Sequence, residues 1–579
     1  MSKTKAASDA WNPGLSSELP SELLPLVTLY TPENSDVGYQ EAKEAADFCG
    51  LKPQDMIAFK VSRLAVHEVL IRVTSDLFVP DGPSYEELGL NLRSMAERIL
   101  DGHVRPRLDE LETAFSAIRS DAQKTLAARL EADIFGPASP PQPAAKPNLL
   151  ARLIGNKTAT KPLEELPELR ALSRWQEQIS TTKDALELAC LKALHTIVGG
   201  IVGQRGRLMA DKDLIVRLAS NLVCNSYGSQ RIGELIEPMV LKAAEAEGYR
   251  LLPYQKAPFV MNVKGASAAG KSTIRPLQRE LAERLGIPWQ DFALVSPDYW
   301  RKFLLDYDSL GDDFKYAAML TGQELEIIDK KLDRYMESKA ARGQMPHLLI
   351  DRFRFDSFVS SPKQQADGHL LSRFGETVFI FFMITPPPET VERAWQRGLK
   401  TGRFKAVDDL LYHNIEAYTG MPQLFFTWAN KERQKIHFEF LDNSVPYGQR
   451  PRTAAFGWNG QLNVLDIDCM RSLNRYQRIN IDARRPEDVF EKPTGPEQDF
   501  LAECIQKIPD VNFVDPGSLK VLGRTHNGVR VAQSDAFFQN TGLASAVRSD
   551  SSDKRDDPKD HPPLDVAHEK KFTVGDWGD

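Results

Sequence analysis

The residues best suited to chemistry form a glycine-rich loop, which reads Gly265, Ala266, Ser267, Ala268, Ala269, Gly270, Lys271 and Ser272. The loop fits the pattern G-x-x-x-x-G-K-[ST] without a mismatch. Its glycines let the backbone curl so that successive N–H groups can point at phosphate oxygens. Lys271 would add positive charge near the β- and γ-phosphates, and the Ser272 hydroxyl would bind Mg²⁺. The loop and the following Thr273 therefore predict a site for ATP and Mg²⁺.

Two elements must position this loop. The apolar run Phe259–Val263 precedes it and has the length of a buried strand, and Thr273–Leu285 follows with the spacing of an amphipathic helix. The N-terminal end of such a helix carries partial positive charge and would face the same phosphates. This strand–loop–helix order argues against a glycine-rich turn that binds nothing.

A carboxylate follows the next predicted strand. The run Ala293–Val295 is followed by Ser296 and Pro297, and Asp298 comes directly after them. Ligands of an open α/β sheet gather at the carboxyl ends of its strands, so we expect Asp298 near the loop. There it could accept the proton of an attacking hydroxyl. The alternative is a helix N-cap, a position that aspartate favours, and the two roles are compatible.

A second carboxylate ends another apolar run. His347–Ile350 has the pattern of a strand, and Asp351 follows it in a position suited to hold Mg²⁺ directly or through water. The alternative interpretation is an ion pair between Asp351 and Arg352 or Arg354. We predict Ser272 and Asp351 as the metal-binding pair.

A basic segment follows the strand predicted over Val378–Ile384. Arg393, Arg397 and Lys400 are spaced so that they share one helix face, and Arg403 lies just past a glycine. In small-molecule kinases a segment at this place acts as a lid whose arginines neutralise charge on the transferred phosphoryl group. The alternative is a solvated basic helix face, but the glycine-rich loop favours the lid.

The composition of the 579 residues restricts the class of protein. The formal net charge of −7 argues against a chain-wide commitment to nucleic acid or to an anionic membrane. The five cysteines are scattered, which is typical of free thiols in a reducing cytosol. The longest apolar stretch, Ala193–Val202, is shorter than the ~20 residues that span a bilayer. We expect a cytoplasmic protein without nucleic-acid or membrane partners, although a Ser-rich N-terminus without a Sec signal also suits a secreted effector.

The alternation of short apolar runs with helical patterns after Pro253 predicts an α/β domain, with a parallel sheet flanked by helices. A mostly α-helical N-terminal half precedes it, and a Pro-rich stretch from Gly136 to Pro143 marks the clearest boundary. The predicted division is 1–36 disordered, 37–135 a helical domain, 136–162 a Pro-rich linker, 163–250 a helical region packing on the next domain, 251–490 the α/β domain, 491–544 a C-terminal extension and 545–579 a disordered tail.

Together these segments resemble the zeta-toxin family of P-loop kinases over about residues 251–470. Members share a Walker A loop, a D-x-x-[RK]-like segment, a helix with an acidic substrate contact, an acid-ended strand and an Arg-rich lid. The matching pieces here are Gly265–Thr273, Asp298–Arg301, the helix that begins near Thr321, Ile350–Arg354 and Arg393–Arg403. An insert from Asp306 to Tyr316 has no counterpart in the shorter members.

The resemblance implies roles for five charged residues. Asp298 would be the general base. Lys271 and Arg403 would contact the transferred phosphoryl group, and Arg393 and Arg397 would contact the nucleotide.

The acceptor side follows from the same resemblance. Arg301 would contact the substrate, and so would Glu324 or Glu326, because the register of their helix can be counted in more than one way. The alternative for both glutamates is a solvated acidic turn. The best-known family reaction phosphorylates the sugar 3′-hydroxyl of UDP-N-acetylglucosamine, and a related effector branch phosphorylates NAD at the adenosine ribose 3′-hydroxyl. The sequence leaves both acceptors open.

The predicted function is an ATP-dependent phosphotransferase that acts on an alcohol group of a small molecule. A toxin or effector role, with an antitoxin or chaperone partner, is implied by the family alone. The alternative is a nucleotide-binding interaction or scaffold protein that uses the α/β domain as a switch. A GTP switch is disfavoured, because the run from Asn430 to Arg433 begins like the guanine-reading N-K-x-D but lacks its aspartate.

Overall fold

The computed structural model describes residues 8–82, 85–136, 166–352, 371–446, 448–491, 499–531, 535–548 and 566–578. The predicted linker after Gly136, the side chain of Arg354 and much of the predicted tail lie outside these residues. The chain divides into two compact units. The helical unit contains Glu22–Val69 and Arg98–Ala243, and the sheet unit contains Met1–Ser21, Leu70–Glu97 and Ala244–Asp579.

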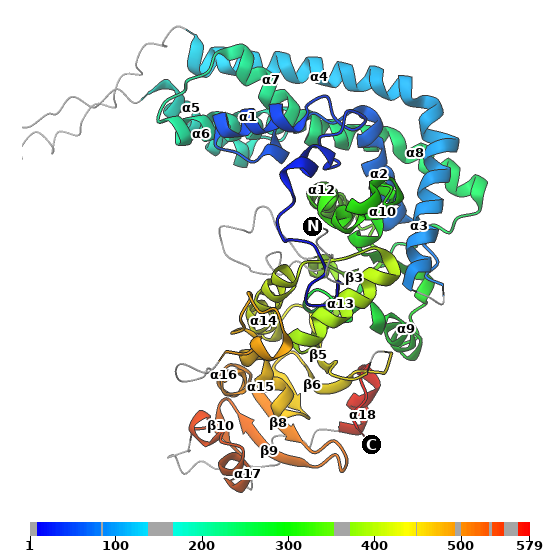
Figure 1. Cartoon of the computed structure of the whole chain (residues 1–579), viewed down its shortest axis with the longest axis vertical. Coiled ribbons are helices and arrows are strands. Elements are labelled where there is room, and N and C mark those ends of the chain that lie inside the picture. Colours follow the sequence, from blue (N-terminus) through cyan, green and yellow to red (C-terminus); the bar gives the residue numbers. More distant parts are fainter. Residues whose placement is uncertain are drawn as a thin grey trace, which may run out of the picture. The chain divides into compact units, whose positions relative to one another are not determined.

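The helical unit is built from helices whose apolar faces are buried. Asp184 and Asp211 cap two of them, because each carboxylate accepts a hydrogen bond from the backbone N–H three residues on, at 2.8 and 2.7 Å. The mostly helical N-terminal half predicted from the sequence is confirmed. The helices are α1 (Tyr39–Cys49), the first part of α2 (Val61–Asp76), α4 (Leu108–Leu130), α5 (Pro167–Thr181), α6 (Ala185–Arg205), α7 (Lys212–Val223) and most of α8 (Ser229–Glu247) (Figure 1).

One of these helices, α6, is long and apolar enough to cross a membrane by length and composition. Among the described residues it is the only helix that passes this test. The core helix of a globular unit passes it too, and α6 buries Cys190, Leu194, Ile197 and Ile201 completely. The apolar stretch recognised in the sequence, Ala193–Val202, is the centre of this helix.

The sheet unit is organised by one mixed sheet, which over the described residues has the order β10-β9-β8-β7-β6-β5-β4-β1-β3-β2. Strands β2, β3, β1, β4 and β5 run parallel to one another, as do β7 and β8. The other pairs are antiparallel. The strands are β1 (Phe259–Lys264), β2 (Phe292–Val295), β3 (His347–Asp351), β4 (Thr377–Ile384), β5 (Lys435–Asp442), β6 (Arg452–Trp458), β7 (Gln461–Val464), β8 (Asp510–Val514), β9 (Val521–His526) and β10 (Val529–Arg530) (Figure 1).

The parallel half of the sheet shows where a ligand can bind. Its strands are buried on both faces and consist of near-continuous apolar runs, as parallel strands covered by helices do. The strand order reverses at β1, because β3 and β2 lie on one side of it and β4 and β5 on the other. The crevice outside the carboxyl ends of the strands at such a reversal is the usual ligand site of an open α/β sheet. The glycine-rich loop leaves β1 at this point.

The helices of the sheet unit lie before, between and after these strands. They are α3 up to Glu97 (Tyr85–Ile99), α9 (Arg275–Arg284), α10 (Arg301–Leu304), α11 (Ala317–Leu320), α12 (Gly322–Ala341), α13 (Pro387–Thr401), α14 (Val407–Ala429), α15 (Ile467–Tyr476), α16 (Phe500–Lys507), α17 (Asp535–Asn540) and α18 (Val566–Glu569). Figure 1 shows α13 and α14 in yellow-green and the last strands, β8 to β10, in orange.

Four predicted strands are confirmed as β1 to β4, and the α/β class with them. The apolar run Leu462–Ile467 also has the pattern of a strand, but the strand there, β7, ends at Val464, and α15 begins at Ile467. Strands β5, β6 and β8 to β10 were not predicted. Since β8 to β10 pair with the same sheet, the predicted extension 491–544 belongs to the sheet unit and is not a separate segment.

The N-terminus differs from the predicted disorder of 1–36. Its described part contains a 3-10 helix, Ser21–Leu26, and buries the side chains of Leu23, Val27, Leu29 and Tyr30. A composition rich in Ser, Pro and Glu hid this short apolar run. The predicted helical domain 37–135 also changes, because Leu70–Glu97 clusters with the sheet unit.

The predicted tail is ordered where the structure describes it, over 566–578. Val574 and Trp577 are buried, and the Trp577 ring packs on Phe456 and Val514 of the sheet. A few apolar residues are enough to order this charged segment, because they pack on an existing sheet and do not have to form a core of their own. The prediction of disorder was therefore wrong for these residues.

The C-terminal residues enclose a carboxylate of β5. Glu439 is completely buried and accepts three hydrogen bonds, from Val574 N at 2.8 Å, from Gly575 N at 2.9 Å and from the Thr453 hydroxyl at 2.8 Å. Burial raises the pKa of Glu439 to about 7, although these donors act in the opposite direction.

The raised pKa of Glu439 predicts a pH-dependent stability. The folded protein keeps a proton that the unfolded chain releases, so the free energy of unfolding falls as the pH rises from about 4.5 to about 7. Glu439 accounts for a decrease in the free energy of unfolding on the order of 3 kcal/mol. We expect Glu439→Gln to remove this decrease, so denaturant unfolding at pH 5 and pH 8 should differ less in the variant than in the wild type. Equal pH dependence of the two proteins would contradict the assignment.

Candidate active site

The backbone of the glycine-rich loop (Gly265–Ser272) needs both of its glycines. A Cβ on Gly265 would lie 2.9 Å from the Cβ of Met383, and a Cβ on Gly270 would lie 2.5 Å from the side-chain nitrogen of Asn443. Gly270 also has a φ of 90°, and Ala268 has a φ of 62°, which is uncommon for a residue with a side chain. Left-handed residues alternating with right-handed ones turn successive N–H groups toward one concavity, which is a shape that binds anions.

Two side chains from neighbouring strand ends hold the loop in place. The Asn443 amide donates to the carbonyl of Ala269 at 2.8 Å, and the Thr385 hydroxyl donates to the same carbonyl at 2.9 Å. Thr385 follows β4, and Asn443 follows β5. Sequence reasoning missed both residues. The signal for Asn443 was a strand, β5, whose apolar residues alternate with lysine, histidine and glutamate.

The element after the loop differs slightly from the predicted helix Thr273–Leu285. A 3-10 turn, Lys271–Ile274, comes first, and the α-helix α9 begins at Arg275. Pro276 stands in the first turn of α9, where its missing N–H costs no hydrogen bond. The turn still presents its N-terminal end to the loop.

Lys271 is folded back on the loop. Its Nζ donates to the carbonyls of Gly265 at 3.1 Å and Ala266 at 2.9 Å. Burial lowers the pKa of Lys271, while the nearby carboxylates of Asp351 and Asp298 raise it. An ammonium group whose partners are neutral carbonyls and nearby carboxylates can turn to an incoming anion at small cost.

The two predicted metal ligands are brought together. The Ser272 hydroxyl donates to Asp351 Oδ2 at 2.8 Å. Of the two alternative partners of Asp351, Arg352 pairs with Asp329 at 2.8 Å and with Asp333 at 2.6 Å, and Arg354 lies outside the described residues. No group of three His, Cys, Asp or Glu side chains that could hold a metal is found over the described residues. One carboxylate and one hydroxyl suit Mg²⁺, which keeps several waters and shares its remaining sites with phosphate oxygens.

Asp298 lies in the first turn of a 3-10 helix, Pro297–Trp300, and its side chain does not cap it. Its carboxylate instead accepts from Arg301 Nε at 3.1 Å and from the guanidinium of Arg403. Burial raises the pKa of Asp298, but the positive charges of Arg403 and Arg301 outweigh burial and hold the pKa well below its usual value. The predicted general base is therefore ionised and paired with a cation of the predicted lid.

The predicted lid is helix α13 and the residues after it. Arg393 is tied down, since its Nη2 donates to the carbonyls of Asn443 at 2.7 Å and Val445 at 3.0 Å, and to Glu389 at 2.9 Å. Arg397 Nε donates to the carbonyl of Arg403 at 3.4 Å, across the helix end. Arg393 and Arg397 are therefore partly buried and held by backbone carbonyls, whereas Lys400 of the same face is exposed.

These parts line one cavity of about 540 Å³. It gathers most of the predicted site residues, which are Ser267, Ala268, Gly270, Lys271, Ser272, Thr273, Asp298, Asp351, Arg393, Arg397 and Arg403. Glu86, Glu392, Gln396, Lys400, Thr401 and Asn443 and the residues Pro446, Gly448 and Gln449 line it as well.

Three predicted substrate contacts are not at the cavity. Glu324 is completely buried inside the first turn of α12, and Glu326 pairs with Lys330 at 3.0 Å. Arg301 donates to Thr321 Oγ1 at 3.0 Å as well as to Asp298, so it orients the base instead of facing the cavity. The helix turns Glu324 inward, whereas Glu326 is partly exposed, and neither of them lines the cavity. A substrate contact by these three residues stays a prediction.

Two acidic residues of the cavity were missed. Glu86 comes from α3, far outside the segment that suggested the site, and Glu392 precedes the arginines of α13. A third missed residue, Lys264, ends β1 and is completely buried beside the loop. Burial holds the pKa of Lys264 well below its usual value, and its Nζ donates to the carbonyl of Arg352 at 3.4 Å. A buried lysine in a strand pattern gives no separate signal in one sequence.

The arrangement can do one kind of chemistry well. A concave run of N–H groups, a lysine and several arginines can hold a chain of phosphates, and the carboxylate of Asp298, paired with Arg403, lines the same cavity. A comparison with protein-family models finds no match, and searches of curated proteins and of solved structures find no significant similarity.

Proposed function

We propose that the sheet unit is a P-loop kinase domain that transfers the γ-phosphoryl group of ATP to a hydroxyl of a small molecule. The observation that carries this proposal is the placement of Asp298 in the same cavity as Lys271 and the Ser272–Asp351 pair. A base, a phosphate cradle and a metal-binding pair are the parts that phosphoryl transfer requires.

In this proposal the glycine-rich loop and Lys271 bind the β- and γ-phosphates. Mg²⁺, held by Ser272 and Asp351, would neutralise charge on the phosphates and orient them. Arg397 and Arg403 stabilise the charge that develops on the transferred group. Arg393 lies between the loop and Pro446, where it fits the nucleoside end of the same ligand.

The ion pair between Asp298 and Arg403 gives the base a role that depends on the ligand. A carboxylate with a strongly lowered pKa is a weak base, so the free site is poorly suited to take a proton. A bound triphosphate offers Arg403 a second anion, and a guanidinium that turns to it leaves Asp298 with less positive charge nearby. The pKa of Asp298 then rises, and the carboxylate can accept the proton of an acceptor hydroxyl.

The acceptor belongs at the Asp298 end of the cavity, where Glu86 can accept a hydrogen bond from a further hydroxyl. UDP-N-acetylglucosamine and NAD both present such hydroxyls, and both stay candidates. A role as toxin or effector, with an antitoxin or chaperone partner, rests on the sequence resemblance alone.

The test is transfer of labelled γ-phosphate from ATP with Mg²⁺ to a panel of UDP-N-acetylglucosamine, NAD and simple nucleosides. We expect label on one acceptor and none when EDTA replaces Mg²⁺. Tight ATP binding without transfer to any acceptor would contradict a small-molecule kinase and would favour the nucleotide-gated interaction protein.

A further inference from the structure

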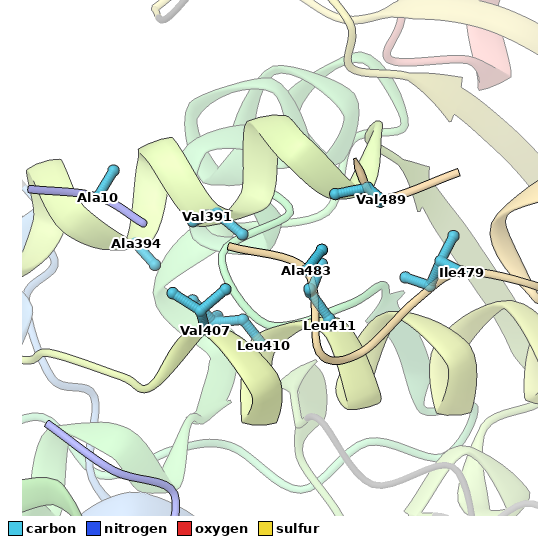
Figure 2. Close-up of a cluster of buried hydrophobic side chains, with 9 residues drawn as sticks. All are labelled: Ala10, Val391, Ala394, Val407, Leu410, Leu411, Ile479, Ala483 and Val489. Carbon is cyan, nitrogen blue, oxygen red and sulfur yellow. The ribbon is translucent and has the colours of Figure 1, made fainter. Parts of the chain in front are cut away.

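The N-terminal residues of the sheet unit pack on helix α13. Ala10 is 7% exposed and lies in a cluster of buried apolar side chains from α13, α14 and the segment after α15. Figure 2 shows Ala10 beside Ala394 of α13, with Val407 and Leu410 of α14 next to them. The cluster is completed by Val391, Leu411, Ile479, Ala483 and Val489.

Hydrogen bonds fix the same N-terminal segment at three points. Trp11 Nε1 donates to Glu392 Oε1 at 2.9 Å. The Ser17 hydroxyl donates to Asp408 of α14 at 2.6 Å, and Lys315 Nζ donates to the carbonyl of Pro13 at 2.8 Å. We call residues 10–17 the N-terminal strap. It links α13, α14 and the acidic, aromatic insert that has no counterpart in the resemblance.

The strap reaches the cavity through two residues. Glu392, the partner of Trp11, lines the cavity one residue before Arg393. Ala268 of the glycine-rich loop, which holds an uncommon positive φ, also lines the cavity and packs against the apolar cluster that contains Ala10. The two walls that would hold the phosphates therefore share one core with the strap.

We propose that Trp11 is a positioning residue for the nucleotide, because it holds the Glu392 carboxylate on the strap side of α13 and away from the phosphates. This inference rests on the proposed function only in that the ligand is a nucleoside triphosphate. A carboxylate that is free to turn into the cavity repels a polyphosphate and competes for the arginines and the lysine beside it. The Trp11 indole N–H removes that freedom.

A second substitution at Glu392 should restore the ATP affinity that a substitution at Trp11 lowers. Trp11→Phe keeps an aromatic ring on the cluster and removes only the hydrogen bond. We expect its Kd for ATP with Mg²⁺, measured by calorimetry, to rise about three- to tenfold. Adding Glu392→Gln to Trp11→Phe should restore the wild-type Kd, because the charge that had been released is gone. A merely structural role of Trp11 would not be rescued in this way.

A second pair of variants tests the strap without any nucleotide. Ala10→Asp places a charge in the buried cluster and should detach the strap, while Ala257→Asp places the same charge at an exposed position. We expect faster amide exchange over α13 in Ala10→Asp only. Equal exchange in both variants, or a raised Kd of Trp11→Phe that Glu392→Gln does not lower, would overturn the inference.

ATP binding by the wild type distinguishes a failure of the proposed function from a failure of this inference. If the wild type binds no ATP, the kinase proposal fails, and the exchange experiment alone decides whether the strap positions α13. If the wild type binds ATP and Trp11→Phe binds it equally well, the inference fails and the kinase proposal is untouched.

Discussion

Asp298→Ala is expected to slow phosphoryl transfer by about 10²–10⁴-fold, which is the usual contribution of a general base. The carboxylate has no substitute at its position, because the other acidic side chains of the cavity are Asp351, which is bonded to Ser272, and Glu86 and Glu392 from other elements. The measurement is the single-turnover rate of γ-phosphate transfer to the acceptor that the panel identifies.

ATP affinity should respond in the opposite direction. Asp298 is paired with Arg403 in the free protein, so its removal leaves that guanidinium available to the phosphates. We expect the Kd for ATP to stay the same or to fall, measured by calorimetry. Asp312→Ala, an exposed aspartate of the insert, is the matched control and should change neither quantity. A large loss of ATP binding in Asp298→Ala would show that the carboxylate holds the site together and does not act as the base.

The strands that the sequence predicted correctly are those that are apolar throughout. β1 and β4 are buried on both faces, and their residues are almost all apolar. β5 is just as deeply buried, but it carries His437 and Glu439, both completely buried. Glu439 is accommodated by a hydrogen bond from a distant part of the chain, Val574 N, and the His437 ring packs on Phe379 and Trp458. Such a contact leaves no trace in the local pattern, so the strand was missed.

The candidate site also contains residues that local patterns predicted and residues that only the tertiary packing brings together. The glycine-rich loop is contiguous, and Asp298 and Asp351 follow predicted strands, so local patterns sufficed to find them. Glu86 and Trp11 lie far away in the sequence; Trp11 and Glu392 are 381 residues apart. Their proximity results from the packing of α3 and the N-terminal strap on the sheet unit, and one sequence cannot show it.

The helix that was expected to contact the acceptor shows that a sequence pattern does not fix which side chains of a helix are buried. Two glutamates that are two residues apart lie on nearly opposite sides of a helix, so an uncertain register leaves open which of them is buried. Glu324 proved to be the buried one. Glu86 of α3, a helix that lies before the segment of family resemblance, lines the cavity instead, and we propose it as an acceptor contact.

Lys271→Ala is expected to lower kcat by about 10²–10³-fold, the usual cost of removing one preorganised group that stabilises the transition state. The lysine lies within the loop that would hold the phosphates, where burial lowers its pKa and the carboxylates of Asp351 and Asp298 act in the opposite direction. The Kd for ATP should rise as well, because the same ammonium binds the phosphates before the reaction. Lys256→Ala, an exposed lysine of the same unit, is the matched control.

The double variant Lys271→Ala/Asp298→Ala separates two interpretations of these losses. Groups that act together in one transition state lose less when removed together than the product of their single losses. We therefore expect the double variant to be only slightly slower than the slower single variant. Losses that multiply fully would mean that the lysine and the aspartate stabilise the transition state independently, which would contradict their acting as one unit.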